Sequence, residues 1–295
     1  MTSLKTAKRQ PVLDAGVIAI MWRREMRRYV RDRSQPFGAL SRTVLWLLIL
    51  GFGLGAALRE IEGYTYAQYI LPGVITLNVL FASLQSAIAL VWDREVGVLR
   101  EVLVSPAPML SVALGKLLGG ASVALVQGTI PLLFAPIVGV RLTLISVLLA
   151  WLVMFSMGLL VTALGVIIAS RMKTFEGFGS ISNGIIQPLY FLSGSIFPLK
   201  GIIGGVGFLD IPDALRAELR RLGIHAVGGG WVVQLPGWIQ ALVYLNPISY
   251  ELDLLRCVLL RFQQLPLLAD LAIAVVLPVV GVVAASRAMG ATRIK

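Results

Sequence analysis

Long apolar runs are the feature that most restricts how this chain can fold. Hydrocarbon about 30 Å thick is crossed by roughly 20 apolar residues in a helix. The chain is 57% hydrophobic and only 14% charged, whereas soluble domains are about 25% charged, and its mean hydropathy is +0.86. These properties predict an all-α integral membrane protein with six transmembrane helices. The predicted spans are Ala39–Leu58, Gln68–Trp92, Leu117–Val140, Leu144–Ser170, Gly179–Leu199 and Pro266–Ser286.

The distribution of positive charge predicts the orientation. The chain has 26 Lys and Arg against 15 Asp and Glu, a net charge of +11. In a membrane protein this excess indicates positive-inside topology and contact with anionic lipid, rather than nucleic-acid binding. Most of the bases lie on one side when both termini are cytoplasmic, and we therefore expect a multi-pass cell-membrane protein of that topology. The first apolar run is interpreted as a signal anchor rather than a cleaved signal peptide. Cys257 is the single cysteine, so no intramolecular disulfide is expected.

Residues 1–38 are predicted to form a cytoplasmic tail and an amphipathic interfacial helix over Gly16–Arg33. Apolar side chains follow one helical face while arginines gather on the other, although Glu25 projects into the apolar stripe. This pattern is typical of a helix that lies on a membrane surface, and the alternative is a solvated basic helix. Pro36 is expected to end it. The interfacial contacts are assigned to Trp22, Arg23, Arg24, Arg27 and Arg28.

The remaining residues, 39–295, are predicted to form one transmembrane domain with two long connections, at 93–116 and 200–265. Glycine-rich flanks and helix signals over Asp213–Leu222 indicate an exposed insert at 201–234 on the extracytoplasmic side. Residues 235–261 are apolar enough to enter the membrane but carry the charged residues Glu251, Asp253 and Arg256. A seventh span here would place the basic carboxyl terminus outside. We therefore predict a re-entrant helical pair, broken at Asn246-Pro247, before the last span.

The first long connection begins with a short charged stretch, Asp93–Pro106, between two apolar runs. Charges at this spacing suit a short helix at the membrane surface, because hydrocarbon expels their carriers. The charge count places this stretch and the amino-terminal helix on the same, cytoplasmic side. It is therefore a candidate contact for a protein outside the membrane.

The sequence lacks the residue patterns of the common catalytic and metal-binding sites. His225 is the single histidine and falls in the predicted insert, and no carboxylate pair lies at mid-membrane depth. Gly115-Lys116 superficially resembles a phosphate-binding loop, but Leu110 and Leu117 stand where that motif needs Gly and Ser or Thr. We expect no catalytic residues, no metal site and no cofactor bound by this chain.

A few polar residues interrupt the predicted spans. They are interpreted either as a polar track for a moving substrate or as interhelical hydrogen-bonding groups, each contributing about 0.6–2 kcal/mol. Acidic residues are missing from the middle of the spans, which argues against a proton- or sodium-coupled carrier, so energy must come from elsewhere. The candidate substrate path consists of Asn78, Gln85, Gln127, Asn183 and Gln187.

Several motifs recur in order along the chain. They are Glu95 and Gly97 with Leu103–Pro106, then Gly115-Lys116, Gly119-Gly120 and Gln127-Gly128, then Pro188-Leu189, Phe191–Gly194 and Phe197-Pro198, and finally Leu235–Trp238, Asn246–Tyr250 and Arg256. Together these motifs resemble the type-2 permease family, the membrane subunits of bacterial and archaeal ABC exporters for drugs, lipo-oligosaccharides and similar cargo. Two departures from that pattern are an insert of about 35 residues at 201–234 and the apolar pair Pro108-Met109 after the Ser-Pro motif.

The resemblance implies a permease subunit that moves a hydrophobic or amphipathic drug, lipid or glycan-lipid outward. It implies a homodimer and two separate cytoplasmic ABC ATPase subunits, which bind the ATP and Mg²⁺. The implied ATPase-coupling residues are Asp93, Arg94, Glu95, Gly97, Arg100, Glu101, Ser105 and Pro106. The implied outer gate consists of Asn246, Pro247, Tyr250, Glu251 and Arg256. Three rivals remain: an ATP-independent carrier or lipid flippase, an intramembrane enzyme, and a non-transporting scaffold.

Overall fold

The computed structural model describes the chain from residue 13 to residue 291 with gaps. The described residues are 13–53, 55, 58–61, 63–97, 107–172, 174–196, 200–205, 225–227, 230–234 and 236–291. Within them, five helical segments are long and apolar enough to cross a membrane: Ser34–Gly53, Tyr66–Glu95, Met109–Leu132, Leu144–Arg171 and Leu267–Gly290. The prediction of a multi-span helical membrane protein is confirmed.

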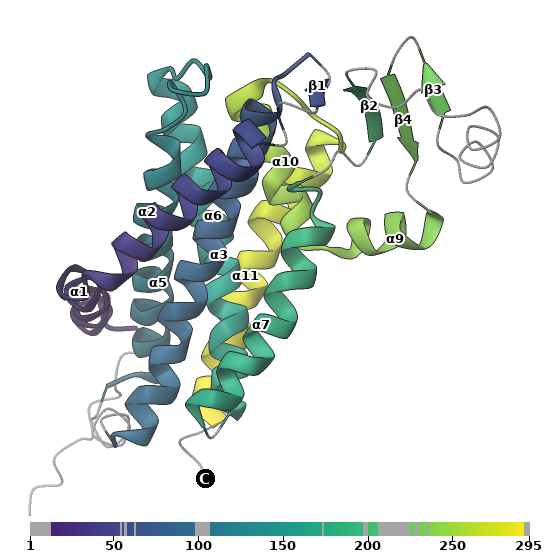
Figure 1. Cartoon of the computed structure of the whole chain (residues 1–295). Helices are drawn as coiled ribbons and strands as arrows, with labels where there is room; N and C mark the ends of the chain where they lie inside the picture. Colours follow the sequence, from purple (N-terminus) through teal and green to yellow (C-terminus); the bar gives the residue numbers. More distant parts are fainter. Residues whose placement is uncertain are drawn as a thin grey trace, which may run out of the picture.

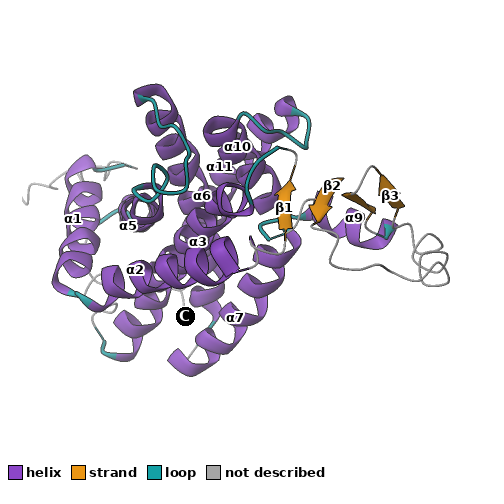
Figure 2. Ribbon diagram, turned by 45° about the horizontal axis from the view of Figure 1, so that its top comes forward, coloured by secondary structure: helices purple, strands orange, loops and turns teal. Residues whose placement is uncertain are grey.

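The long helices form one bundle around α3 (Tyr66–Glu95), which is buried along most of its length (Figure 1). Helices α5 (Met109–Leu132) and α6 (Leu144–Arg171) pack on one side of α3, and α7 (Phe175–Leu192) lies on another side. Helix α11 (Leu267–Ala291) packs mainly on α6. The view in Figure 2 shows the same arrangement with α3 enclosed by its neighbours.

The second and fourth predicted spans match α3 and α6 closely because strong caps set their starts. Thr65 and Thr143 each accept a hydrogen bond from the third residue of the helix, whose side chain bonds back to the cap in a reciprocal capping box. The last span is also confirmed, because α11 covers the predicted run and continues to Ala291.

The first predicted span is displaced toward the amino terminus. Helix α1 (Ala15–Arg31) ends before α2 (Ser34–Trp46), which continues into a π-helical segment η1 (Leu47–Gly53). Pro36 therefore does not end α1. It lies in the first turn of α2, where proline is tolerated because the first N–H groups of a helix have no intrahelical acceptor. The predicted end at Leu58 is wrong, because that residue begins strand β1.

The third predicted span is displaced in the same direction. Helix α5 begins at Met109 and ends at Leu132, and turns follow to Gly139, so the predicted limits Leu117 and Val140 are wrong. Lys116, predicted to lie in the connection, is inside this helix and only 2% exposed. A buried partner makes this position tolerable for a cation, as described below.

The six-span count depends on α7. The fifth run was predicted to cover Gly179–Leu199, but the helix extends from Phe175 to Leu192, and it does not qualify among the membrane-crossing candidates. Its 18 residues include the polar Asn183 and Gln187, which lower its mean hydropathy.

The connections at the far end of the bundle form a small antiparallel sheet, which the all-α prediction missed. Its strands are β1 (Leu58–Ile61), β2 (Lys200–Gly205), β3 (His225–Val227) and β4 (Gly230–Gln234), in the order β1-β2-β4-β3. Figure 1 shows the sheet at the end of the bundle opposite the carboxyl terminus. The predicted helix Asp213–Leu222 lies outside the described residues.

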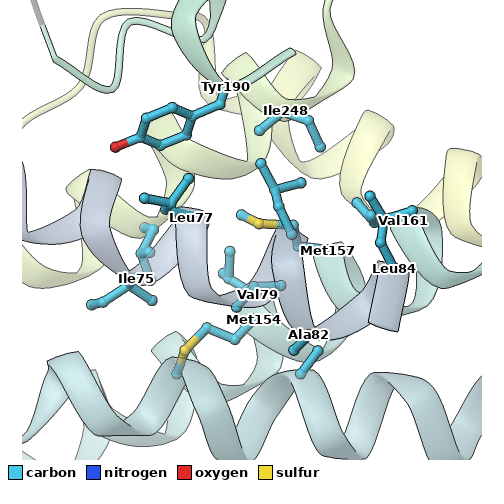
Figure 3. Packing of buried hydrophobic residues seen from close by; sticks show 14 of the residues in the cluster. Ile75, Leu77, Val79, Ala82, Leu84, Met154, Met157, Val161, Tyr190 and Ile248 are labelled. Atoms are coloured by element: carbon cyan, nitrogen blue, oxygen red, sulfur yellow. The ribbon is translucent and has the colours of Figure 1, made fainter. Parts of the chain in front are cut away.

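Close helix packing in the core depends on small side chains. Figure 3 shows Leu77, Val79 and Ala82 of α3 beside Met154 and Met157 of α6. A Cβ atom added at Gly128 would lie 2.7 Å from the Met154 sulfur, and one added at Gly165 would lie 2.5 Å from Ala87 Cβ. Gly128 lets α5 approach α6, and Gly165 lets α6 approach α3, closely enough to exclude lipid between the helices.

Candidate functional site

The candidate site is the end of the bundle where α3 terminates at the charged stretch. The predicted coupling residues Asp93, Arg94 and Glu95 form the last turn of α3 rather than a separate helix. Gly97, which follows, has φ +85°, a left-handed conformation that glycine adopts without strain and that commonly terminates helices. The other predicted coupling residues, Arg100, Glu101, Ser105 and Pro106, lie outside the described residues.

Arg94 ties the end of α3 to the end of α6. Its Nη1 donates to the carbonyl oxygen of Met172 at 2.7 Å, and its Nη2 donates to that of Ser170 at 3.1 Å. The last carbonyls of a helix lack intrahelical donors and carry partial negative charge, so a guanidinium is stabilising there. Arg94 therefore holds two helices together by a contact that favours a cation.

Glu95 makes the complementary contact with α7. Its carboxylate accepts the backbone N–H of Phe175 at 3.0 Å, at the helix start where N–H groups are free and partial charge is positive. The aromatic rings of Trp92 and Phe175 pack edge to face beside it, with centroids 6.0 Å apart. The same turn of α3 thus reaches α6 through a cation and α7 through an anion.

Asp93 connects this turn to the amino-terminal helix α1 (Ala15–Arg31). Its Oδ1 lies 2.6 Å from Arg24 Nη2, and both side chains are partly covered. The ends of α3 and α6, the start of α7 and the middle of α1 therefore meet at one turn of three consecutive charged residues. We name this arrangement, Asp93, Arg94 and Glu95 with their partners Arg24, Met172 and Phe175, the α3 joint.

Helix α1 is itself fixed to the bundle by a buried ion pair. Glu25 Oε1 lies 2.9 Å from Lys116 Nζ of α5, and Glu25 Oε2 lies 3.0 Å from Arg28. The hydroxyl of Ser86 in α3 also contacts Glu25, at 3.5 Å. Burial would raise the pKa of Glu25, but Lys116 and Arg28 outweigh that effect, so this pKa lies below its usual value. The carboxylate is therefore charged and paired.

Two glycines one helical turn apart allow this contact. A Cβ atom at Gly115 would meet the carbonyl oxygen of Ile18 at 2.6 Å, and one at Gly119 would meet Glu25 Cβ at 2.7 Å. Backbones can approach this closely where glycines are spaced as in a small-xxx-small motif. The sequence already indicated that Glu25 breaks the apolar stripe of α1, but its partner 91 residues away was missed.

The other predicted interfacial residues divide between protein contact and exposure. Trp22 is 40% exposed, but its indole N–H donates to Ser122 of α5 at 3.0 Å. Arg23 and Arg27 are exposed on the outer face of α1. The predicted membrane contact of this face is not tested by the structure, whereas the packing of α1 on α5 is established.

The predicted substrate path is only partly brought together. Asn78 is buried and donates to Thr43 at 3.2 Å, and Gln127 donates to Gln35 at 3.4 Å, so both serve interhelical hydrogen bonding. In contrast, Gln85 and Asn183 line a pocket of about 120 Å³ between α3 and α7. Gln187 is exposed one turn further along α7.

The predicted outer-gate residues lie at a break between α9 (Gly237–Leu245) and α10 (Pro247–Leu260). Asn246 caps α10 by accepting the N–H of Ile248, while its side-chain amide donates to Leu189 of α7 at 2.7 Å. The predicted break at Asn246-Pro247 is confirmed, although the geometry does not establish re-entrance. Figure 1 shows α9 standing away from the bundle, whereas α10 is packed inside it.

The remaining outer-gate residues contact different groups. The Tyr250 hydroxyl donates to the carbonyl of Tyr244 at 2.8 Å, and the Arg256 guanidinium stacks on Tyr69 and donates to Gly194. Glu251 is fully buried and contacts Ser156 of α6 at 3.0 Å. These side chains hold α10 against neighbouring helices rather than facing an open passage.

Comparison with known proteins agrees with this arrangement. The family model described as "ABC-2 type transporter" matches residues 17–209. The inner membrane transport permease YadH of Escherichia coli K12 is 26% identical over 270 residues, 87% of this chain and 88% of that protein. Nodulation protein J of Sinorhizobium fredii NGR234 is 24% identical over 239 residues, 80% of this chain and 78% of that protein. With this match over most of its helical bundle, the chain belongs to the ABC-2 type transporter family, whose members are transport permeases.

Proposed function

We propose that this permease is the membrane half of an ABC exporter. Two copies of the chain assemble with two separate ATPase subunits, and ATP hydrolysis on those subunits drives a hydrophobic or amphipathic cargo outward. The observation that carries the proposal is the α3 joint. It joins the ends of α3 and α6, the start of α7 and the middle of α1 at the beginning of the charged stretch that the sequence marks as a contact for an external protein.

The α3 joint gives a physical route from the ATPase to the membrane. A force on residues 98–106 acts first on the end of α3. Arg94 passes the displacement to α6, Glu95 passes it to α7, and Asp93 passes it to α1. The cargo pocket between α3 and α7 would change shape as these helices move together.

A second copy is expected to cover the outer face of α7. Asn183 and Gln187, together with Ser180, are exposed on this helix. Polar side chains that face lipid are unfavourable, so in the membrane this face gains from an interhelical partner. Support for the homodimer therefore comes from a polar helix face that a single chain leaves uncovered.

The orientation follows from positive charge. Arg23 and Arg27 are exposed beside the α3 joint, and the positive-inside rule places such residues in the cytoplasm. With Cys257 replaced by alanine, a cysteine at position 176 should be labelled only from the cytoplasm, and one at position 218 only from outside. The reverse pattern would contradict the topology.

The decisive experiment separates ATPase docking from force transmission. In a reconstituted complex with the partner ATPase, Glu101→Lys should abolish co-purification. Arg94→Ala should keep co-purification but reduce cargo-stimulated ATP hydrolysis severalfold, because the link from α3 to α6 is lost. Arg171→Ala, which removes an exposed arginine at the same end of α6, is the matched control.

Two results would count against the proposal. If Arg94→Ala stimulates ATP hydrolysis as well as the wild type does, the α3 joint does not transmit force. If cargo export persists when every partner ATPase is removed, the chain is an ATP-independent carrier instead.

A further inference from the structure

Helix α10 is buried although it carries three charged residues within six positions. Glu251, Asp253 and Arg256 are each at most 2% exposed. Arg256 is engaged with Tyr69 and Gly194, so it does not pair directly with Glu251. A carboxyl group buried without a cation is strongly disfavoured in its charged form. The contacts of these acids must therefore decide which of them are protonated.

Ser156 of α6 shows that Glu251 carries a proton. The Ser156 hydroxyl contacts two oxygen atoms, the carbonyl of Ala274 in α11 and Glu251 Oε1. A carbonyl can only accept, so the single hydroxyl proton of Ser156 belongs to the contact with Ala274. The contact with Glu251 then needs a proton from the carboxyl group, which must be neutral to donate it.

Asp270 carries a second proton. Asp253 accepts the backbone N–H groups of Gln264 at 3.0 Å and Leu265 at 2.8 Å, which favours its charged form. Asp270, in the first turn of α11, is fully buried, and neither of its carboxyl oxygens has a hydrogen-bond partner among the described residues. A buried carboxyl group without a donor or a cation is neutral, because nothing compensates the hydration that its charged form would lose.

The surroundings offer protons rather than a metal ion as the binding partner. Among the residues that the structure describes, no group of three or more His, Cys, Asp or Glu side chains could hold a metal ion. The other polar and titratable groups near Asp253 and Asp270 are Tyr250, Arg256, Cys257 and Gln263. Of these, only Arg256 is a cation, and it is already engaged.

We propose that Glu251 and Asp270 are neutral acids and that the proton on Glu251 latches α10 onto α6 and α11. Glu251 donates to Ser156 of α6, which donates to the carbonyl of Ala274 in α11. Loss of the Glu251 proton converts a hydrogen bond into a contact between acceptors, and loss of the Asp270 proton leaves a buried charge at the start of α11. The latch therefore weakens as the pH rises, and α10 is released from its neighbours.

The test is an infrared measurement on the purified chain in a detergent without ester groups, because only a protonated carboxyl gives the acid carbonyl band. At neutral pH the wild type should show this band. Glu251→Gln and Asp270→Asn should each remove part of it, and the double variant should lose both contributions. Glu176→Gln, which changes an exposed carboxyl of α7, should leave the band unchanged. No band in the wild type, or an undiminished band in the double variant, would overturn the proposal.

A titration of the wild type supplies a second measurement that does not depend on folding of the variants. Raising the pH from neutral to alkaline should abolish the band and lower the unfolding temperature together. The double variant keeps amide donors at both positions, so its unfolding temperature should fall less over the same range. Loss of the band without any loss of stability would show that these protons do not latch α10.

Discussion

The buried pair between Glu25 and Lys116 allows a quantitative prediction about how α1 is held. Both side chains are at most 3% exposed. Removing one partner of a buried ion pair typically costs about 3–5 kcal/mol, because the other charge stays buried without compensation. In Lys116→Met, Arg28 still lies 3.0 Å from Glu25, so the lower end, about 3 kcal/mol, is expected.

The assay is thermal unfolding in detergent combined with limited trypsin digestion. At roughly 2–4 °C per kcal/mol, the predicted loss lowers the unfolding temperature by about 6–12 °C. Release of α1 should also expose its arginines, so cleavage within Ala15–Arg31 should become faster. The control is the double variant Glu25→Met with Lys116→Met, which removes both charges and should lie within about 1 kcal/mol of the wild type.

Two outcomes would refute this reasoning. An unfolding temperature unchanged in Lys116→Met would mean that the pair does not hold α1. A double variant as unstable as the single variant would mean that Lys116 acts through packing of its alkyl chain rather than through its charge.

Three further predictions concern the α1 contact and the cap of α10. Gly119→Ala places a methyl 2.7 Å from Glu25 Cβ and should destabilise the α1 contact by about 1–3 kcal/mol, measured by unfolding, whereas Gly38→Ala, with nothing within 4 Å, should not. Because the folded pKa of Glu25 is depressed, its contribution to stability is complete above about pH 4.5 and is lost as the pH falls through the lower folded value, so the unfolding temperature should fall only in acid. Asn246→Ala should lower the free energy of unfolding by about 1 kcal/mol through the lost helix cap, and by more if the contact with Leu189 is stabilising. An unchanged unfolding temperature would exclude both roles.

The sequence predicted the spans best where the apolar run and the cap agree. Thr65 and Thr143 sit directly before α3 and α6, so these two helices start within two residues of the predicted spans. The first span shifted because proline was taken as a stop, although the first helical turn tolerates it. The third shifted because Lys116 was taken as a loop residue. A charge indicates a surface only when no buried partner exists, and a single sequence does not reveal the partner.

The contacts within the candidate site could not be predicted from the sequence. Asp93, Arg94 and Glu95 were expected to contact an external protein, which stays a prediction, and in the structure they bind Arg24, the end of α6 and the start of α7. These contacts join residues that are 69 to 80 positions apart in the sequence, and two of them involve backbone atoms of the partner. No pattern of residue types in a single sequence predicts such contacts. The sheet could have been suspected in part, because the strand Gly230–Gln234 contains Trp and two Val, which favour strands.

The two glycines of α5 have a consequence for motion. Gly115 and Gly119 are separated by about one helical turn, so the backbone of α1 is seated in two matching notches. Sliding α1 along α5 by less than a turn would drive its side chains against the adjacent, larger residues. Helix α1 must therefore travel as a rigid extension of α5, and a fluorophore at the exposed Arg31 would report at the surface every tilt that α5 makes inside the membrane.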